Sequence, residues 1–174
     1  MLSEKKEENS CRRSAERFLL LYCSSIVLGM NDALVEFTGA LAGFSFALES
    51  TRLVALTGSI TGIAAALSMA ASEYLSTRSD PATLKCPRRA ALWTGASYLT
   101  TVSLLTLPYL LFLRAGVALG VMLAIALGVI ALYSYLYTKI RGTSFRRHFG
   151  EMVAVSFGVA LLSFLIGYGL KEFS

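Results

Sequence analysis

The stretch LGMNDALVEFTGALAG, residues Leu28 to Gly43, decides the fold class of this chain. It lies inside a hydrophobic run from Phe18 to Leu48, yet it contains Asn31, Asp32 and Glu36 within six positions. The run is longer than the ~20 apolar residues that an α-helix needs to cross a hydrocarbon core about 30 Å thick. Two carboxylates therefore stand in a segment that otherwise predicts a membrane-spanning helix.

The composition of the whole chain agrees with a membrane protein. Of its 174 residues, 55% are hydrophobic and the mean hydropathy is +0.63, whereas soluble domains contain roughly 45–50% apolar residues. Strand-like alternation is absent, and helices satisfy their own backbone hydrogen bonds in lipid. We predict an all-α polytopic protein with a polar tail at residues 1–17 and one five-helix transmembrane domain at residues 18–174. The predicted spans are Phe18–Leu48, Leu53–Ser76, Ala90–Leu113, Gly116–Thr138 and Met152–Leu170.

The positions of the basic residues predict the orientation of the chain. The tail and the second and fourth loops together hold 13 of the 16 Lys and Arg residues. Basic residues favour the cytoplasmic side, so we predict a cytoplasmic N-terminus and, after an odd number of helices, a C-terminus outside. The tail lacks the small-residue cleavage pattern of a signal peptide, so we expect the first helix to remain in the mature protein. The net charge of +5 is dispersed over loops near the membrane and does not predict binding of nucleic acid.

The cysteine and histidine residues predict neither a disulfide nor an enzyme active site. Cys11, Cys23 and Cys86 have no C-x-x-C spacing, so we expect free thiols. His148, the single histidine, lies in a basic loop where we expect it to be solvated. Without a Ser–His pairing or an H-E-x-x-H motif, the sequence predicts no enzyme, no catalytic residue and no permanently bound cofactor.

The depth of Asp32 makes it the strongest functional candidate. At 1.5 Å per residue, Asp32 lies roughly 21 Å along the helix from Phe18, near the membrane midplane. A carboxylate there costs about 2.5–3.5 kcal/mol on insertion scales, so such residues usually mark ion or proton pathways. Glu36 follows one turn outward. At 100° per residue, Gly39 and Gly43 are predicted to share a stripe with both carboxylates, as a GxxxG pair.

The second apolar segment repeats this design in the opposite direction. Gly62, Met69 and Glu73 are spaced seven and four residues apart on one helical face, and Gly58 completes a second GxxxG pair. Glu73 would lie near the cytoplasmic mouth and Met69 about 6 Å deeper. Carboxylate oxygens with one thioether sulfur suit a divalent transition metal. The predicted metal-binding residues are Asp32, Glu36, Met69 and Glu73.

At these residues the sequence resembles the vacuolar iron transporter family. The motif Gly29, Asn31, Asp32 and Ala33, followed by Ser68, Met69, Glu73, Tyr74 and Ser76, is similar to the family's first and second helices. The resemblance implies a homodimer that exports Fe²⁺, and often Mn²⁺, from the cytosol in exchange for protons. It also implies that Asp32, Met69 and Glu73 line the path.

The chain departs from the better-known members of that family in three places. They insert a glutamate-rich metal-binding unit between helices two and three, whereas residues 77–89 here form a short basic loop with Asp80 as its only acid. The tail is too short for the ferritin-like domain of some relatives. Ala33 replaces the usual glycine, and Glu36 adds a carboxylate at a position that is often small or uncharged.

Two other functions remain open from the sequence. A proton-coupled transporter of another solute would use the same carboxylates without needing Met69. A non-transporting membrane interaction protein would explain the GxxxG pairs but not Asp32. For a metal transporter, the expected partners are divalent metal ions, protons, membrane lipids and a second copy of the chain. The expected location is the plasma membrane of a prokaryote, or a vacuolar or other endomembrane of a eukaryote.

Overall fold

The structure is a computed structural model that describes residues 21–48, 50–141 and 144–172. Every element of these residues is helical. The first helix, Leu21–Ala47, includes a five-residue π-helical turn and its continuation α2. The elements are η1 (Ala33–Phe37), α2 (Thr38–Ala47), α3 (Thr51–Ser79), α4 (Pro87–Leu111), α5 (Ala115–Arg141) and α6 (Phe145–Glu172).

Four of these helices are long and apolar enough to cross a membrane. They are Leu21–Ala47, Thr51–Ser79, Pro87–Leu111 and Ala115–Lys139. The all-α class is thereby confirmed for the described residues. Helix α6 covers the fifth predicted span but is not among the four, so the fifth crossing and the sidedness of the termini stay predictions. The predicted tail at residues 1–17 lies outside the described residues.

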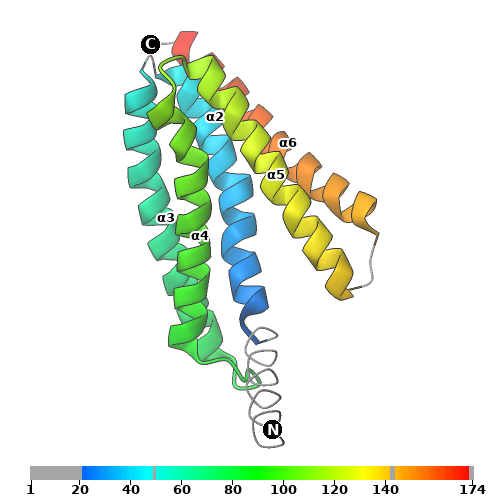
Figure 1. The fold of residues 1–174 in the computed structure, drawn as a ribbon. Coiled ribbons are helices and arrows are strands. Elements are labelled where there is room, and N and C mark those ends of the chain that lie inside the picture. The colour runs from blue at the N-terminus through cyan, green and yellow to red at the C-terminus, as the bar shows by residue number, and fades with distance from the viewer. Residues whose placement is uncertain (1–20, 49, 142–143, 173–174) are drawn as a thin grey trace, which may run out of the picture.

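The helices run up and down in sequence order (Figure 1). The first helix, α3 and α4 lie close together, while α5 and α6 cross them obliquely and diverge from them at the lower end. The α3–α4 connection lies at the same end as the start of the first helix, and the last turn of α6 lies at the opposite end.

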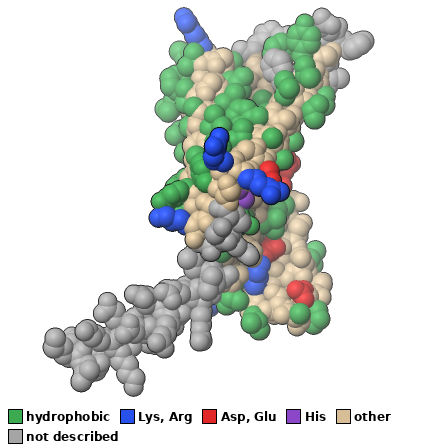
Figure 2. Space-filling view, turned by 90° about the vertical axis from the view of Figure 1, so that its right-hand side faces the viewer, with side chains coloured by type: hydrophobic (Ala, Val, Ile, Leu, Met, Phe, Trp, Pro, Cys, Tyr) green, Lys and Arg blue, Asp and Glu red, His purple; other side chains and the backbone are tan. Residues whose placement is uncertain are grey.

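The outer surface of the bundle is apolar. Along α3, Leu56, Ile60, Ile63 and Leu67 are all exposed at spacings of three or four residues, which places them on one face. Figure 2 shows hydrophobic side chains over the upper part of another face, while most of its Lys and Arg side chains lie at mid-height or below. In water such apolar surface would be unfavourable, whereas lipid tails can cover it.

Glycines let the first helix, α3 and α4 approach one another closely. A Cβ on Gly58 would lie 2.8 Å from Leu41 Cδ2, and one on Gly62 would lie 3.1 Å from Phe37 Cε2. On the other side of the first helix, Gly29 faces the Thr94 carbonyl oxygen of α4. The second GxxxG pair therefore packs α3 against the first helix, as the antiparallel arrangement predicts, and Gly62 also packs against Val102 of α4.

The first GxxxG pair corrects one prediction from the sequence. Gly39 and Gly43 face α6 of the same chain, where a Cβ on Gly39 would lie 3.0 Å from Val159 Cγ1. Glu36, by contrast, is exposed. The predicted single stripe is wrong because the π-helical turn Ala33–Phe37 interrupts the 100° periodicity between Asp32 and Gly39.

The close approach at Gly29 generates a stability prediction. Gly29→Ala should lower the free energy of unfolding by about 2 kcal/mol, because overpacking against a backbone carbonyl outweighs the gain in helix propensity. Gly128→Ala is the matched control, since no atom beyond its chain neighbours and the nearby backbone of its own helix lies within 4 Å of its Cβ position among the described residues. Unfolding in detergent micelles, followed by circular dichroism, would measure both. A Gly29→Ala variant at least as stable as Gly128→Ala would contradict the packing.

Candidate functional site

The middle of the first helix carries a polar group formed by Asp32, Glu36 and Tyr98. Tyr98, on α4, is fully buried, and its hydroxyl donates a hydrogen bond of 3.3 Å to Glu36 Oε2. The carboxyl groups of Asp32 and Glu36 lie close enough to interact with each other. Asp32 is half-buried and Glu36 is exposed. The two carboxyl groups therefore meet at the edge of the packed bundle, where one side remains open to another molecule.

Local backbone structure places this pair. Asp32 is the residue immediately before the π-helical turn, and Glu36 lies within that turn. Turns of this type are rare in α-helices and occur frequently at functional sites. Beside Asp32, the buried Asn31 Oδ1 has no hydrogen-bond partner among the described residues. Its free carbonyl oxygen adds a third oxygen acceptor to this part of the helix.

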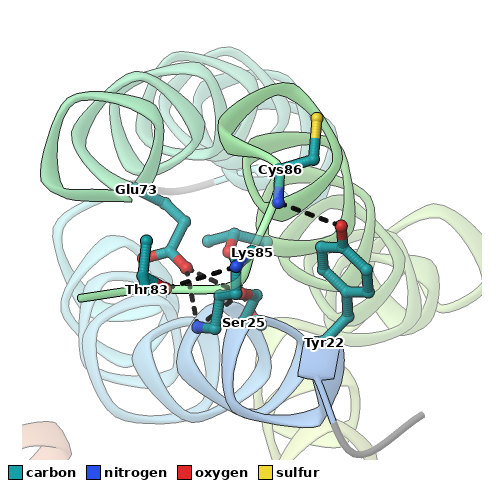
Figure 3. Close-up of polar contacts among 7 residues, drawn as sticks. Tyr22, Ser25, Glu73, Thr83, Lys85 and Cys86 are labelled. Atoms are coloured by element: carbon teal, nitrogen blue, oxygen red, sulfur yellow. Dashed lines mark hydrogen bonds and ion pairs between the residues drawn. The ribbon is translucent and has the colours of Figure 1, made fainter. Parts of the chain in front are cut away.

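Glu73 belongs to a second polar group, at the end of the bundle that contains the α3–α4 connection (Figure 3). Ser25 Oγ donates a hydrogen bond of 2.6 Å to Glu73 Oε1. The Lys85 ammonium lies 3.4 Å from the same carboxylate oxygen and 3.2 Å from Ser25 Oγ. Glu73 is thus a buried carboxylate that is paired with a cation of its own chain.

The α3–α4 connection is fixed around this group at several points. The Cys86 backbone N–H donates to the Tyr22 hydroxyl at 3.1 Å, and Thr94 Oγ1 donates to the Ser25 carbonyl at 3.0 Å. Within the connection, Asp80 Oδ1 accepts a hydrogen bond from the Ala82 N–H at 3.0 Å. These bonds join the first helix, the connection and α4 beside Glu73.

The four predicted metal-binding residues thus divide between two groups. Asp32 and Glu36 are together, Glu73 lies with Ser25 and Lys85, and Met69 is half-buried against the hydrophobic core one turn from Glu73. In the described part of the chain, no three His, Cys, Asp or Glu side chains gather into a metal-binding cluster. The predicted four-residue ligand set stays a prediction.

Sequence reasoning missed Tyr98, Ser25 and Lys85. The spacing of Ser25, seven residues and so about two helical turns before Asp32, could have placed it on the same face. Tyr98 and Lys85 carry no comparable signal, because their roles depend on how α4 and the loop before it pack.

His148 also differs from its prediction. Instead of being solvated, it is half-buried, with its ring stacked on Tyr137 at 4.3 Å between centroids and Nδ1 3.3 Å from Ser134 Oγ. It therefore joins the start of α6 to the end of α5. Cys23 and Cys86 are free thiols, as predicted, and Cys11 lies outside the described residues.

These features define an integral membrane protein of packed helices that holds ionisable groups within its apolar length. The comparison with protein families agrees. The family model described as VIT family matches residues 23–88, which run from the first helix through α3 into the start of α4. The matched segment contains Asp32, Met69 and Glu73, and it confirms the resemblance to the vacuolar iron transporter family. No curated protein matches the chain. The family match indicates transport of metal ions across a membrane.

The Ser25–Glu73 bond generates a second stability prediction. Ser25→Ala should lower the free energy of unfolding by about 2 kcal/mol, because the buried Glu73 carboxylate loses a hydrogen bond to a charged group. Ser103→Ala is the control, since the exposed Ser103 Oγ bonds only the Leu99 carbonyl of its own helix at 2.8 Å. We expect that control to stay within about 0.5 kcal/mol. Equal stabilities of the two variants in micelles would contradict the assigned bond.

Proposed function

We propose that this protein exports a divalent transition metal, Fe²⁺ or Mn²⁺, from the cytosol in exchange for protons. The observation that carries the proposal is the pair of interacting carboxyl groups, Asp32 and Glu36, at a π-helical turn in the middle of a membrane-spanning helix. Charged residues at such depth are costly and mark ion pathways. The pair lies within the segment that the VIT family model matches, and this match supports a metal ion as the cargo.

The residues suggest an order of events along the path. Glu73 would receive the metal ion at the cytoplasmic mouth, Met69 and Asp32 would bind it near the midplane, and Glu36 would take part toward the exit. Carboxylate oxygens and a thioether sulfur together favour a transition metal over an alkali ion. Met69 and Glu73 are four residues apart, so they follow each other on one face of α3.

Proton exchange follows from the chemistry of these ligands. A carboxylate binds a metal ion in its deprotonated form, so binding of the metal releases any proton that the site holds. Two carboxyl groups in contact make this exchange more favourable, because their mutual repulsion favours either a shared proton or a bound cation. Asp32 and Glu36 can thus hold a proton or a metal ion, but a state with neither leaves two adjacent charges in the membrane.

The same pair supports a homodimer. The first helix carries an accessible stripe of residues at four-residue intervals. It consists of the exposed Ser24, Leu28 and Glu36 and the half-buried Asp32. A carboxylate on such a stripe is too costly to leave against lipid. A second copy of the chain could cover it about a twofold axis, so that two first helices enclose the path between them. Gly39 and Gly43 are not available for a contact with a second copy, because α6 of the same chain covers their face.

The central test of the proposal is Asp32→Asn. The amide has the same shape but brings no charge to the metal, so we expect metal flux into proteoliposomes to fall at least about 100-fold while helicity and thermal stability are kept. Asp80→Asn is the control, because Asp80 is an exposed acid of the α3–α4 connection. We expect its flux to stay within twofold. Undiminished flux of Asp32→Asn would overturn the proposed path.

A second variant tests whether the cargo is a transition metal. Met69→Leu keeps the volume of the side chain but removes the sulfur, so Fe²⁺ and Mn²⁺ flux should fall several-fold relative to Ca²⁺. Met122→Leu, in the hydrophobic core of α5, is the control for packing. The assay compares Fe²⁺, Mn²⁺, Zn²⁺ and Ca²⁺ in the same vesicles. If no metal is transported while a proton gradient drives another solute, the proposed cargo is wrong.

A further inference from the structure

The Lys85 ammonium is paired with the Glu73 carboxylate at the proposed entrance (Figure 3). Its ammonium lies 3.4 Å from Glu73 Oε1 and 3.2 Å from Ser25 Oγ. The Glu73 side chain is only 9% exposed, while that of Lys85 is 22% exposed. The cation therefore lies on the outer side of the pair, between the buried carboxylate and the aqueous end of the bundle.

The backbone of Lys85 is held independently of its ammonium. The N–H of the next residue, Cys86, donates to the Tyr22 hydroxyl, and the Lys85 N–H donates to Thr83 Oγ1 at 3.4 Å. The ammonium itself is at the end of a flexible four-carbon chain. It can leave Glu73 by rotation of its own side chain, while the α3–α4 connection remains in place.

A buried carboxylate requires a compensating charge whether or not cargo is present. Leaving Glu73 without a cation would be strongly unfavourable, because the cost of burying a lone charge exceeds that of burying a pair. Lys85 supplies this charge in the structure. A cation from solution must therefore displace a competitor whose local concentration is high because it is part of the same chain.

We propose that Lys85 is a tethered cation that occupies Glu73 and is displaced by the incoming divalent ion. A divalent ion carries twice the charge of the ammonium and can replace it, whereas Na⁺ or K⁺ offers no greater charge and must also outcompete a tethered group. Lys85 thereby sets the apparent affinity of the entrance and excludes monovalent cations. This inference rests on the proposed role of Glu73 as entry ligand, but the displacement itself can be measured without transport.

The direct test is a zero-length crosslink in the full-length protein in detergent. A water-soluble carbodiimide joins Lys85 Nζ to the Glu73 carboxyl as an amide, with the reagent taking up the water, and mass spectrometry quantifies the joined peptides. We expect Mn²⁺ to reduce the yield at least fivefold with a saturable midpoint, while 150 mM Na⁺ or K⁺ changes it less than twofold. Labelling of Asp80 by carbodiimide and an added amine is the internal control and should not respond to Mn²⁺.

Two results of this experiment would overturn the inference. One is a yield that saturating Mn²⁺ leaves unchanged, and the other is displacement by Na⁺ as effective as that by Mn²⁺. If Mn²⁺ suppresses the crosslink but no vesicle transports metal, the tethered cation stands and the proposed function fails. If metal is transported while Mn²⁺ does not change the crosslink yield, the proposed function is supported and the proposed role of Lys85 is wrong.

Variants separate this role from a structural one. Lys85→Gln should lower the half-saturating Mn²⁺ concentration for transport about fivefold, because the competitor is absent. Arg88→Gln removes the same charge from an exposed position of the same region and should change that concentration less than twofold. Lys85→Arg keeps a cation and should resemble the unmodified protein.

If the role of Lys85 is purely structural, Lys85→Gln would instead lower the maximal rate and leave the half-saturating Mn²⁺ concentration unchanged. That result would refute the proposal. If Lys85→Gln does not fold, the crosslink on the unmodified chain decides the question.

Discussion

The structure depends on one constraint, the cost of holding carboxylates inside an apolar bundle. Lipid offers no hydrogen bonds or counter-charges, so each acid needs a partner from protein, water or cargo. Glu36 is bonded by Tyr98, and Glu73 is bonded by Ser25 and paired with Lys85. Asp32 interacts with Glu36, another acid. Among the described residues, the Asp32–Glu36 pair is therefore the less compensated of the two groups, and a cation or a proton would compensate it.

Close helix packing makes these partnerships possible. Tyr98 reaches Glu36 because α4 lies against the first helix, and that approach depends on a glycine at position 29. Glu73 reaches Ser25 because α3 packs on the first helix through Gly58 and Gly62. The small residues at these contacts and the polar residues beside them are therefore parts of one arrangement. A larger side chain at a contact would move the acids away from their partners as well as the helices from each other.

Much of this arrangement could be predicted from the sequence. The apolar runs were long enough to define the helices, with most ends within three residues of those observed, although α6 begins at Phe145, seven residues before the predicted Met152. The motif around Asp32, Met69 and Glu73 indicated a resemblance to the vacuolar iron transporter family, and the VIT family model matches the segment that holds these residues. These features depend on local composition and spacing, which a sequence contains directly.

The remaining features depend on tertiary structure. The π-helical turn changes the phase of the first helix, so regular periodicity assigned Gly39 and Gly43 to the wrong face. Lys85 is one of several basic residues near the α3–α4 connection, and only the folded path of that segment selects it as the partner of Glu73. His148 likewise looked like a loop residue until Tyr133 and Tyr137 were seen beside it.

The π-helical turn also divides the first helix into two halves with different neighbours. Because one extra residue in a turn shifts the following residues by about 100°, the half before Ala33 and the half after Phe37 present differently oriented surfaces. The first half carries the open stripe that ends in the carboxylates, and the second half packs its small residues on α6. A single residue inserted into an ordinary helix is enough to produce this division. In evolutionary terms, one such insertion can assign a continuous helix two separate roles without any change in the number or order of the helices.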